Sequence, residues 1–342
     1  MDSYFVYISS VDKEIWAMNL DGSSPRQLTH DGKGQTTYQT LLAASPDGHY
    51  LAYFTDSWYI VKEGRQVQKL ALLDLTTGEQ SLLTNQDSTG NVVWSPDSQQ
   101  LAYARYDVPT VPDYCYRWKA YVIPFEGGPS REIGHGQCSS AELRWSPDGS
   151  TILYTSKEAG GDYPQLYAMN PDGTKIRRLT DTKSGCFICY FPQWTPDGQS
   201  IVFYNHPDLY SMRSDGSDLR KLTDFQEIYN VIDVAHARYN QPDMIVTADS
   251  QTLVYVMGNP LQIVRMTLQP GGWERRTLIS DITRNPQIYS HALCCLSPDE
   301  STLYYLGSVQ GGDGLYALNM DLGEPYLVAA GIEQPLMVKG QG

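Results

Sequence analysis

Histidine, arginine and carboxylate side chains stand close together in one segment of the chain and could carry acid–base chemistry. His236 and Arg238 are two residues apart in DVAHARYN, and Asp243 follows. An imidazole can act as a general base, and a nearby guanidinium can stabilise negative charge, as β-elimination requires. A solvated histidine in a loop is the alternative interpretation. We therefore treat His236 and Arg238 as candidate contact residues and assign no catalytic residue.

A second polar group is defined by its distance from a recurring Ser-Pro-Asp turn. The residues four or six positions before the first residue of that turn include Gln39, Asn91, Glu142, Gln241, Asp243 and His291. If alternate residues of the preceding strand point into a central channel, these six line it as a polar ring. Such a ring could hold a hydrated divalent cation or a polar ligand group, and a solvated pore is the alternative. We expect no cofactor and no protein metal site, with a channel cation as the alternative.

Aromatic residues supply a third candidate surface. The chain holds 25 Tyr, and the segment ARYDVPTVPDYCYRW at 104–118 is rich in rings. Rings with polar tips give contact area at low entropic cost, which suits a peptide, a protein partner or a glycan. Covering the edges of the fold is the alternative role for each ring. The candidate contact residues are Tyr106, Tyr114, Tyr116, Trp118, Tyr190, His236, Arg238, Tyr239 and His291.

The elements that position these residues follow from an internal repeat. Six related strings begin about 50 residues apart, a period typical of repeat architectures. They are SPDGHYLAY (45–53), SPDSQQLAY (95–103), SPDGSTILY (146–154), TPDGQSIVF (195–203), TADSQTLVY (247–255) and SPDESTLYY (297–305). Each unit contains an apolar strand often ending in Trp, the turn, a second strand, a third strand such as LYAMNP, a Gly-containing hairpin and a closing R-x-L-T strand.

Four antiparallel strands per unit, with no helical period, predict the blade of a β-propeller. The chain opens inside a unit that lacks its first strand, and PLMVK (335–339) follows the last complete unit. We predict an all-β, seven-bladed propeller of four-stranded antiparallel blades, formed by residues 1–342 as a single domain. In this arrangement PLMVK supplies the missing first strand and leaves no open sheet edge at the closure.

The W-S-P-D-G turn, the L-A-Y strand, the Asp-Gly hairpin and the R-x-L-T strand together resemble the TolB-like and WD40-like propellers with SPDG repeats. The resemblance covers nearly the whole chain and implies the propeller fold. The same propeller occurs in prolyl-oligopeptidase-like peptidases, but this sequence contains no Gly-x-Ser-x-Gly elbow. We therefore expect a non-catalytic binding or interaction scaffold that uses the aromatic, acidic face at the channel mouth.

The blade layout also looks like that of oligogalacturonate lyases, a family that holds manganese with several histidines and a glutamine ahead of such turns. Only His291 falls at a matching place here, six residues before Ser297. A metal-dependent polysaccharide lyase is therefore the alternative function. It would place His291 and Asp243 near a cation, with His236 or Arg238 handling the proton.

Charge and cysteine content limit the partners and the compartment. The net charge of −14 would repel nucleic acid, and no apolar run is long enough to span a membrane, so we expect neither partner. Without a recognisable export signal we expect a cytoplasmic protein, or a periplasmic or extracellular one if a leader was removed. Buried free thiols are the favoured state of the six cysteines, with a Cys115–Cys138 disulfide as the alternative. The adjacent Cys294 and Cys295 should point to opposite faces of a strand.

Overall fold

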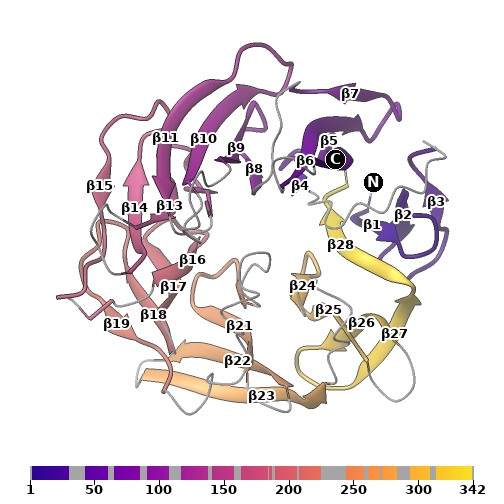
Figure 1. The fold of residues 1–342 in the computed structure, drawn as a ribbon. Coiled ribbons are helices and arrows are strands. Elements are labelled where there is room, and N and C mark those ends of the chain that lie inside the picture. The colour runs from indigo at the N-terminus through magenta and orange to yellow at the C-terminus, as the bar shows by residue number, and fades with distance from the viewer. Residues whose placement is uncertain are drawn as a thin grey trace.

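Seven four-stranded antiparallel sheets are arranged as the blades of a ring in the computed structural model (Figure 1). The sheet order β28-β1-β2-β3 defines blade 1, and blades 2 to 7 follow with four consecutive strands each, from β4 to β27. The predicted all-β, seven-bladed fold is confirmed. The structure describes residues 2–30, 43–60, 65–84, 91–107, 117–137, 141–157, 163–183, 185–186, 189–205, 208–224, 244–257, 261–269, 272–282, 293–308 and 313–340.

Within each blade the four strands are arranged in order from the centre of the ring to its rim (Figure 1). In the order of blades 1 to 7, the inner strands are β28 (Ile332–Val338), β4 (Ala43–Ala44), β8 (Val92–Trp94), β12 (Arg144–Trp145), β16 (Cys189–Trp194), β20 (Met244–Val246) and β24 (Leu293–Leu296). The second strands are β1 (Tyr4–Ser9), β5 (Tyr50–Ile60), β9 (Gln100–Asp107), β13 (Ile152–Ser156), β17 (Ser200–Asn205), β21 (Thr252–Met257) and β25 (Thr302–Ser308).

The outer half of each blade holds the third and fourth strands. The third strands are β2 (Ile15–Asn19), β6 (Arg65–Asp74), β10 (Arg117–Pro124), β14 (Gln165–Met169), β18 (Asp208–Arg213), β22 (Leu261–Gln269) and β26 (Asp313–Asn319). The fourth strands are β3 (Arg26–Gln27), β7 (Gln80–Leu82), β11 (Arg131–Gln137), β15 (Arg177–Arg178), β19 (Arg220–Lys221), β23 (Gly272–Ile282) and β27 (Pro325–Ala330). Among the described residues, no helix is long and apolar enough to cross a bilayer.

The two ends of the chain meet in blade 1, as predicted. Strand β28 pairs antiparallel with β1, and Met337 lies opposite Phe5. The Nζ atom of Lys13 lies 2.7 Å from Oε1 of Glu333, which joins the turn after β1 to the same strand. Pairing with β28 covers the inner edge of β1, so blade 1 has four strands like the other blades.

The hydrophobic core is divided into seven clusters, and each lies between two neighbouring blades. The cluster that contains Phe5 and Tyr304 joins blade 7 to blade 1, with ring centroids 4.8 Å apart and planes at 80°. Because strand residues alternate between the two faces of a sheet, each blade contributes one set of apolar side chains to each neighbour. The seam where the chain closes is therefore packed like the six other interfaces.

The tryptophans that end several inner strands also join neighbouring blades through hydrogen bonds. The indole Nε1 of Trp94 in blade 3 donates to the carbonyl oxygen of Ala43 in blade 2 at 2.8 Å. Trp194 in blade 5 makes the equivalent bond to the carbonyl of Arg144 in blade 4 at 3.4 Å. A buried indole N–H favours such an acceptor, and the inner strand of the preceding blade supplies it for these two tryptophans.

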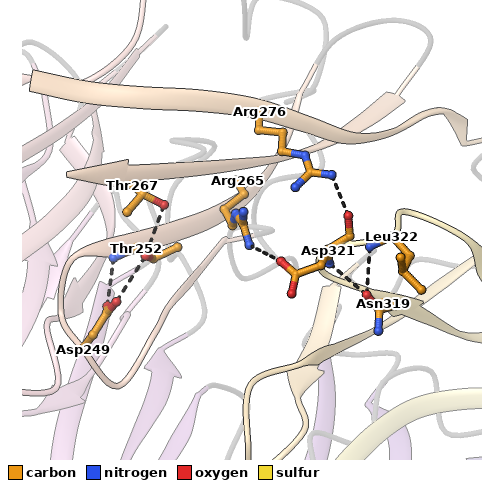
Figure 2. Close-up of polar contacts among 8 residues, drawn as sticks. All are labelled: Asp249, Thr252, Arg265, Thr267, Arg276, Asn319, Asp321 and Leu322. Carbon is orange, nitrogen blue, oxygen red and sulfur yellow. Dashed lines mark hydrogen bonds and ion pairs between the residues drawn. The ribbon is translucent and has the colours of Figure 1, made fainter. Parts of the chain in front are cut away.

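Arginines of the outer strands hold the next blade by its hairpin. Nη2 of Arg276 on β23 donates to the backbone oxygen of Asp321 at 2.6 Å, and Nη1 of Arg265 lies 3.4 Å from the Asp321 carboxylate (Figure 2). Equivalent contacts join Arg131 to the carbonyl of Pro171 at 3.1 Å and Arg177 to the carbonyl of Ser214 at 3.0 Å. Arg177, which belongs to the R-x-L-T strand of blade 4, therefore has a structural role there.

The recurring turn is held by its own hydroxyl and carboxylate groups. In blade 4 the hydroxyl of Ser146 donates to Asp148 at 2.5 Å and accepts the backbone N–H of Thr151 at 2.9 Å. The Asp148 carboxylate also accepts the N–H of Ser150 at 3.0 Å. A carboxylate that accepts several hydrogen bonds is stabilised in its charged form. This need for a hydroxyl followed two residues later by Asp explains why the turn recurs with so little change.

These turns should make the protein less stable in acid. A hydrogen bond from the hydroxyl of the turn serine lowers the pKa of Asp97, Asp148 and Asp299 below its usual value. Hydrogen bonds from backbone N–H groups lower it further, by a smaller amount. Because the pKa is lower in the folded chain, this stabilisation is complete above the unfolded-state pKa of about 4 and is lost as pH falls through the folded-state pKa. The free energy of unfolding of the wild type, measured with denaturant, should fall between about pH 6 and about pH 2.5. The loss should be smaller in Ser146→Ala, and an unchanged pH dependence would contradict this account.

The cysteines differ from the expectation in two places. Cys186 and Cys189, both fully buried, form a disulfide, so the prediction of free thiols is wrong for this pair. Cys294 and Cys295 have their Sγ atoms 3.2 Å apart, so the prediction that they point to opposite faces is also wrong. A bulge in β24 interrupts the alternation of side chains at this point. Cys115 and Cys138 lie outside the described residues.

Candidate functional site

Trp118, predicted as a ligand contact, is a core residue, and this corrects the prediction. Its side chain is 1% exposed and packs edge-on against Tyr154 of blade 4, with ring centroids 5.6 Å apart. A Cβ atom on Gly136 would lie 2.2 Å from the indole, so the adjacent strand β11 needs glycine to make room for it. Strand β10 includes Trp118, and the alternation of side chains along that strand turns the indole toward blade 4.

Tyr106 and Tyr190 are also engaged within the protein. The hydroxyl of Tyr106, on β9, accepts the backbone N–H of Ala141 at 2.8 Å and so links blade 3 to blade 4. Tyr190 is half-buried on β16 beside Phe191, with ring centroids 5.9 Å apart. These contacts favour the alternative role, in which aromatic rings cover the edges of blades. The other candidate contacts, Tyr114, Tyr116, His236, Arg238, Tyr239 and His291, lie outside the described residues and remain predictions.

The inner strands of blades 3 to 5 present a polar group next to the channel. Glu142, predicted to line the channel, is 6% exposed, and its Oε2 atom accepts the backbone N–H of Phe191 in blade 5 at 2.5 Å. Phe191 has a φ of 55°, a left-handed conformation that non-glycine residues rarely adopt. The bulge in β16 turns this N–H toward the carboxylate. Glu142 therefore holds two inner strands together.

Arg144 lies two residues after Glu142 and was not among the predicted channel residues. Burial lowers the pKa of its guanidinium, and the opposite charge of Glu142 raises it in part. An arginine side chain stays charged even where burial lowers its pKa. Its Nη1 donates to the carbonyl of Leu143 at 2.9 Å, while its Nη2 is buried and has no hydrogen-bond partner in the part of the chain that the structure describes. One donor of the Arg144 guanidinium is thus left without an acceptor among the described residues.

Three amide side chains, from blades 1, 3 and 5, lie on an inner strand or directly before one. Asn91, another predicted channel residue, is half-buried just before β8, and its Oδ1 has no partner within the described ranges. Oε1 of Gln334 on β28 is also buried and has no hydrogen-bond partner among the described residues. Gln193 on β16 donates to the carbonyl of Met244 in blade 6 at 3.2 Å. We call Asn91, Glu142, Arg144, Gln193 and Gln334 the inner polar set.

Sequence reasoning missed Arg144 and Gln193 because it examined positions four and six before the turn. Both residues stand two positions before it, and the same alternation along a strand would have included them. Three further predicted channel residues, Gln39, Gln241 and Asp243, lie outside the described residues. Among the described residues, no three His, Cys, Asp or Glu side chains are grouped so that they could hold a metal ion. Both the expectation of no cofactor and its alternative, a cation in the channel, therefore stay predictions.

Seven four-stranded blades, six of which carry the recurring turn and one of which is completed by the last strand, define this chain as a β-propeller of the TolB-like class. The chain belongs to the TolB beta propeller domain family, whose model matches residues 42–227. That range covers blades 2 to 5, where the turn repeats with the least change. The predicted resemblance is therefore confirmed.

Two curated relatives match parts of the chain. The uncharacterized peptidase YuxL of Bacillus subtilis (strain 168) is 36% identical over 109 residues, which are 32% of this chain and 16% of that protein. The Tol-Pal system protein TolB of Anaeromyxobacter dehalogenans (strain 2CP-C) is 31% identical over 179 residues, which are 52% of this chain and 36% of that protein. The matches thus span well under two thirds of either relative.

A solved structure of an oligogalacturonate lyase in complex with manganese superposes on this chain with a TM-score of 0.65. The superposition covers 90% of this chain and 83% of that chain at 18% identity. At this identity the likeness shows the shared fold alone.

Proposed function

We propose that this propeller is a non-catalytic binding scaffold and that the inner polar set binds a peptide segment of a protein partner. Membership of the TolB propeller family supports a binding role at the coarse level. The observation that carries the finer proposal is the buried, unpartnered Nη2 of Arg144 in the described structure. A buried charged donor without an acceptor is costly, so a ligand that supplies the acceptor gains this energy on binding.

The unpaired atoms of the inner polar set match the groups of a peptide bond. Arg144 offers a donor, which suits a backbone carbonyl, and the Oδ1 of Asn91 offers an acceptor, which suits a backbone N–H. The two residues come from adjacent blades, on β12 and directly before β8. A net charge of −14 favours a partner that is basic overall. A glycan, whose hydroxyls both donate and accept, is the second ligand class that this surface suits.

Peptide selection with a matched pair of variants tests the proposal. We expect the wild-type protein to enrich peptides from a random displayed library, and Arg144→Gln to bind the selected peptides at least about tenfold more weakly, since a charged hydrogen bond contributes about 1.5 kcal/mol or more. Arg220→Gln is the control because it removes the same charge from the exposed outer strand β19. Failure to enrich peptides, or equal affinity of Arg144→Gln and wild type, would refute the peptide proposal, and a glycan array would then test the second class.

The alternative function is a metal-dependent polysaccharide lyase, with a divalent cation in the channel. Elemental analysis of the purified protein, combined with an absorbance assay for unsaturated uronate product, separates it from the scaffold. Stoichiometric manganese together with new absorbance would replace the scaffold proposal with the lyase.

For the compartment, the Cys186–Cys189 disulfide favours the periplasm or the cell exterior over the cytoplasm, because disulfides persist where thiols are not continuously reduced.

A further inference from the structure

Two adjacent thiols lie within contact distance on the innermost strand of blade 7. The Sγ atoms of Cys294 and Cys295 are 3.2 Å apart, and neither residue is in a disulfide. In the pairing of β24 with β25, Leu293 faces Tyr305 and Cys295 faces Tyr304, so Cys294 is the extra residue of a bulge. Adjacent residues of a regular strand point to opposite faces. The bulge removes that alternation and brings the two sulfur atoms together.

The pair lies at the seam where the ring closes. The Sγ of Cys294 donates to the carbonyl oxygen of Pro335 on β28 at 3.2 Å, and Cys295 is close enough to donate to Cys294. Both side chains are half-buried and pack against the cluster between blades 7 and 1. The hydrogen bond with Cys295 raises the pKa of Cys294 well above its usual value, and burial of the thiol raises it further. Cys294 is therefore a protonated thiol near neutral pH.

We propose that Cys294 and Cys295 form a reversible dithiol–disulfide site at this seam and that a small-molecule disulfide is the oxidant. The thiolate of Cys295 attacks one sulfur of the small disulfide, which gives a mixed disulfide and releases one small thiolate. Cys294 then loses its proton and attacks the Cys295 sulfur, which forms the Cys294–Cys295 bond and releases the second small thiol. The cysteine pair loses two hydrogens in total, and the small disulfide is reduced to two thiols.

Oxidation changes a contact between blades. Formation of the Cys294–Cys295 bond removes the thiol hydrogen that Cys294 donates to the carbonyl oxygen of Pro335. Blade 7 therefore loses one hydrogen bond to the closing strand β28. Cys294 and Cys295 are half-buried free thiols, whereas Cys186 and Cys189 are fully buried and already joined by a disulfide. We therefore expect the oxidised protein to have a lower thermal midpoint than the reduced protein, with the midpoint restored by dithiothreitol.

Mass spectrometry of the folded protein tests the site directly. After incubation with oxidised glutathione and alkylation of the remaining thiols, we expect the peptide that contains both cysteines to be lighter by two hydrogens and to carry no alkyl group. Reduction should restore both alkylation sites. Phenylarsine oxide, a trivalent arsenical that needs two thiols, should protect both cysteines of the wild type from alkylation. Cys294→Ser and Cys295→Ser are matched controls, and their remaining thiol should stay open to alkylation in the presence of the arsenical.

Two results would overturn the site. One is complete alkylation of both cysteines after treatment of the wild type with oxidised glutathione. The other is a stable glutathione adduct on one of them without the internal bond, because a second thiol at 3.2 Å should displace the adduct. The arsenical measurement is independent of the oxidant, so loss of protection in wild type would also contradict the proposed geometry.

Discussion

Val338→Asp should reduce the free energy of unfolding by on the order of 4 kcal/mol, because it places an unpaired carboxylate in an apolar core. Val338 is 0% exposed at the end of β28 and packs in the cluster between blades 1 and 2. That cluster includes Val6 and Leu51, so a charge there acts on both blades. Urea unfolding followed by circular dichroism measures the change.

Lys339→Asp provides the control for the closing strand. Lys339 is exposed and directly follows Val338, so this substitution introduces the same carboxylate at almost the same point of the chain. We expect it to change stability by no more than about 0.5 kcal/mol. If Val338→Asp were as stable as Lys339→Asp, the last strand would not be packed in the ring, and the closure described above would be wrong.

Trp118→Ala should cost about 3 to 5 kcal/mol of folding stability, the range for removing a large buried aromatic side chain. The indole is 1% exposed and fills the space between blades 3 and 4, beside Tyr154 and Gly136. Its removal leaves a cavity that β10 cannot move to fill, since this strand is paired with a neighbouring strand on each side. The thermal midpoint and urea unfolding curve both report this loss.

A second tryptophan distinguishes a structural role from a binding role. Trp273 on β23 is 37% exposed, so Trp273→Ala should have a much smaller effect on stability. The peptides selected on wild type should bind to folded Trp118→Ala with unchanged affinity at a temperature well below its midpoint. A Trp118→Ala protein of full stability that had lost peptide binding would restore Trp118 as a ligand contact.

The fold could be predicted from sequence because its information is local and repeated. Each Ser-Pro-Asp turn carries the hydroxyl and carboxylate that hold it, as Ser146 and Asp148 show, so the turn can be recognised without knowledge of its neighbours. The regular spacing then implies the number of blades. The unmatched segment 335–339 implies the closure, because an inner strand was missing from the first unit.

The candidate site was predicted only in part, because a residue type does not show which neighbour its side chain meets. Tyr106, Trp118 and Tyr190 have the composition of a binding surface, yet the described contacts place their rings against neighbouring residues of the propeller. Glu142 was identified as a channel residue, but its bond to the N–H of Phe191 depends on a bulge in another blade. Such irregularities arise from the packing of one blade on the next and leave no signal in the repeat.

The amino-acid sequence by itself determined the strand order, the number of blades and the segment that closes the ring, since turns and alternating strands depend on residues close together in the chain. Only the tertiary structure decided that Arg144 keeps a buried donor, that Trp118 belongs to the core and that Cys294 meets Cys295. The physical reason is that burial and bulges depend on contacts between blades, whose residues are about 50 positions apart in the chain.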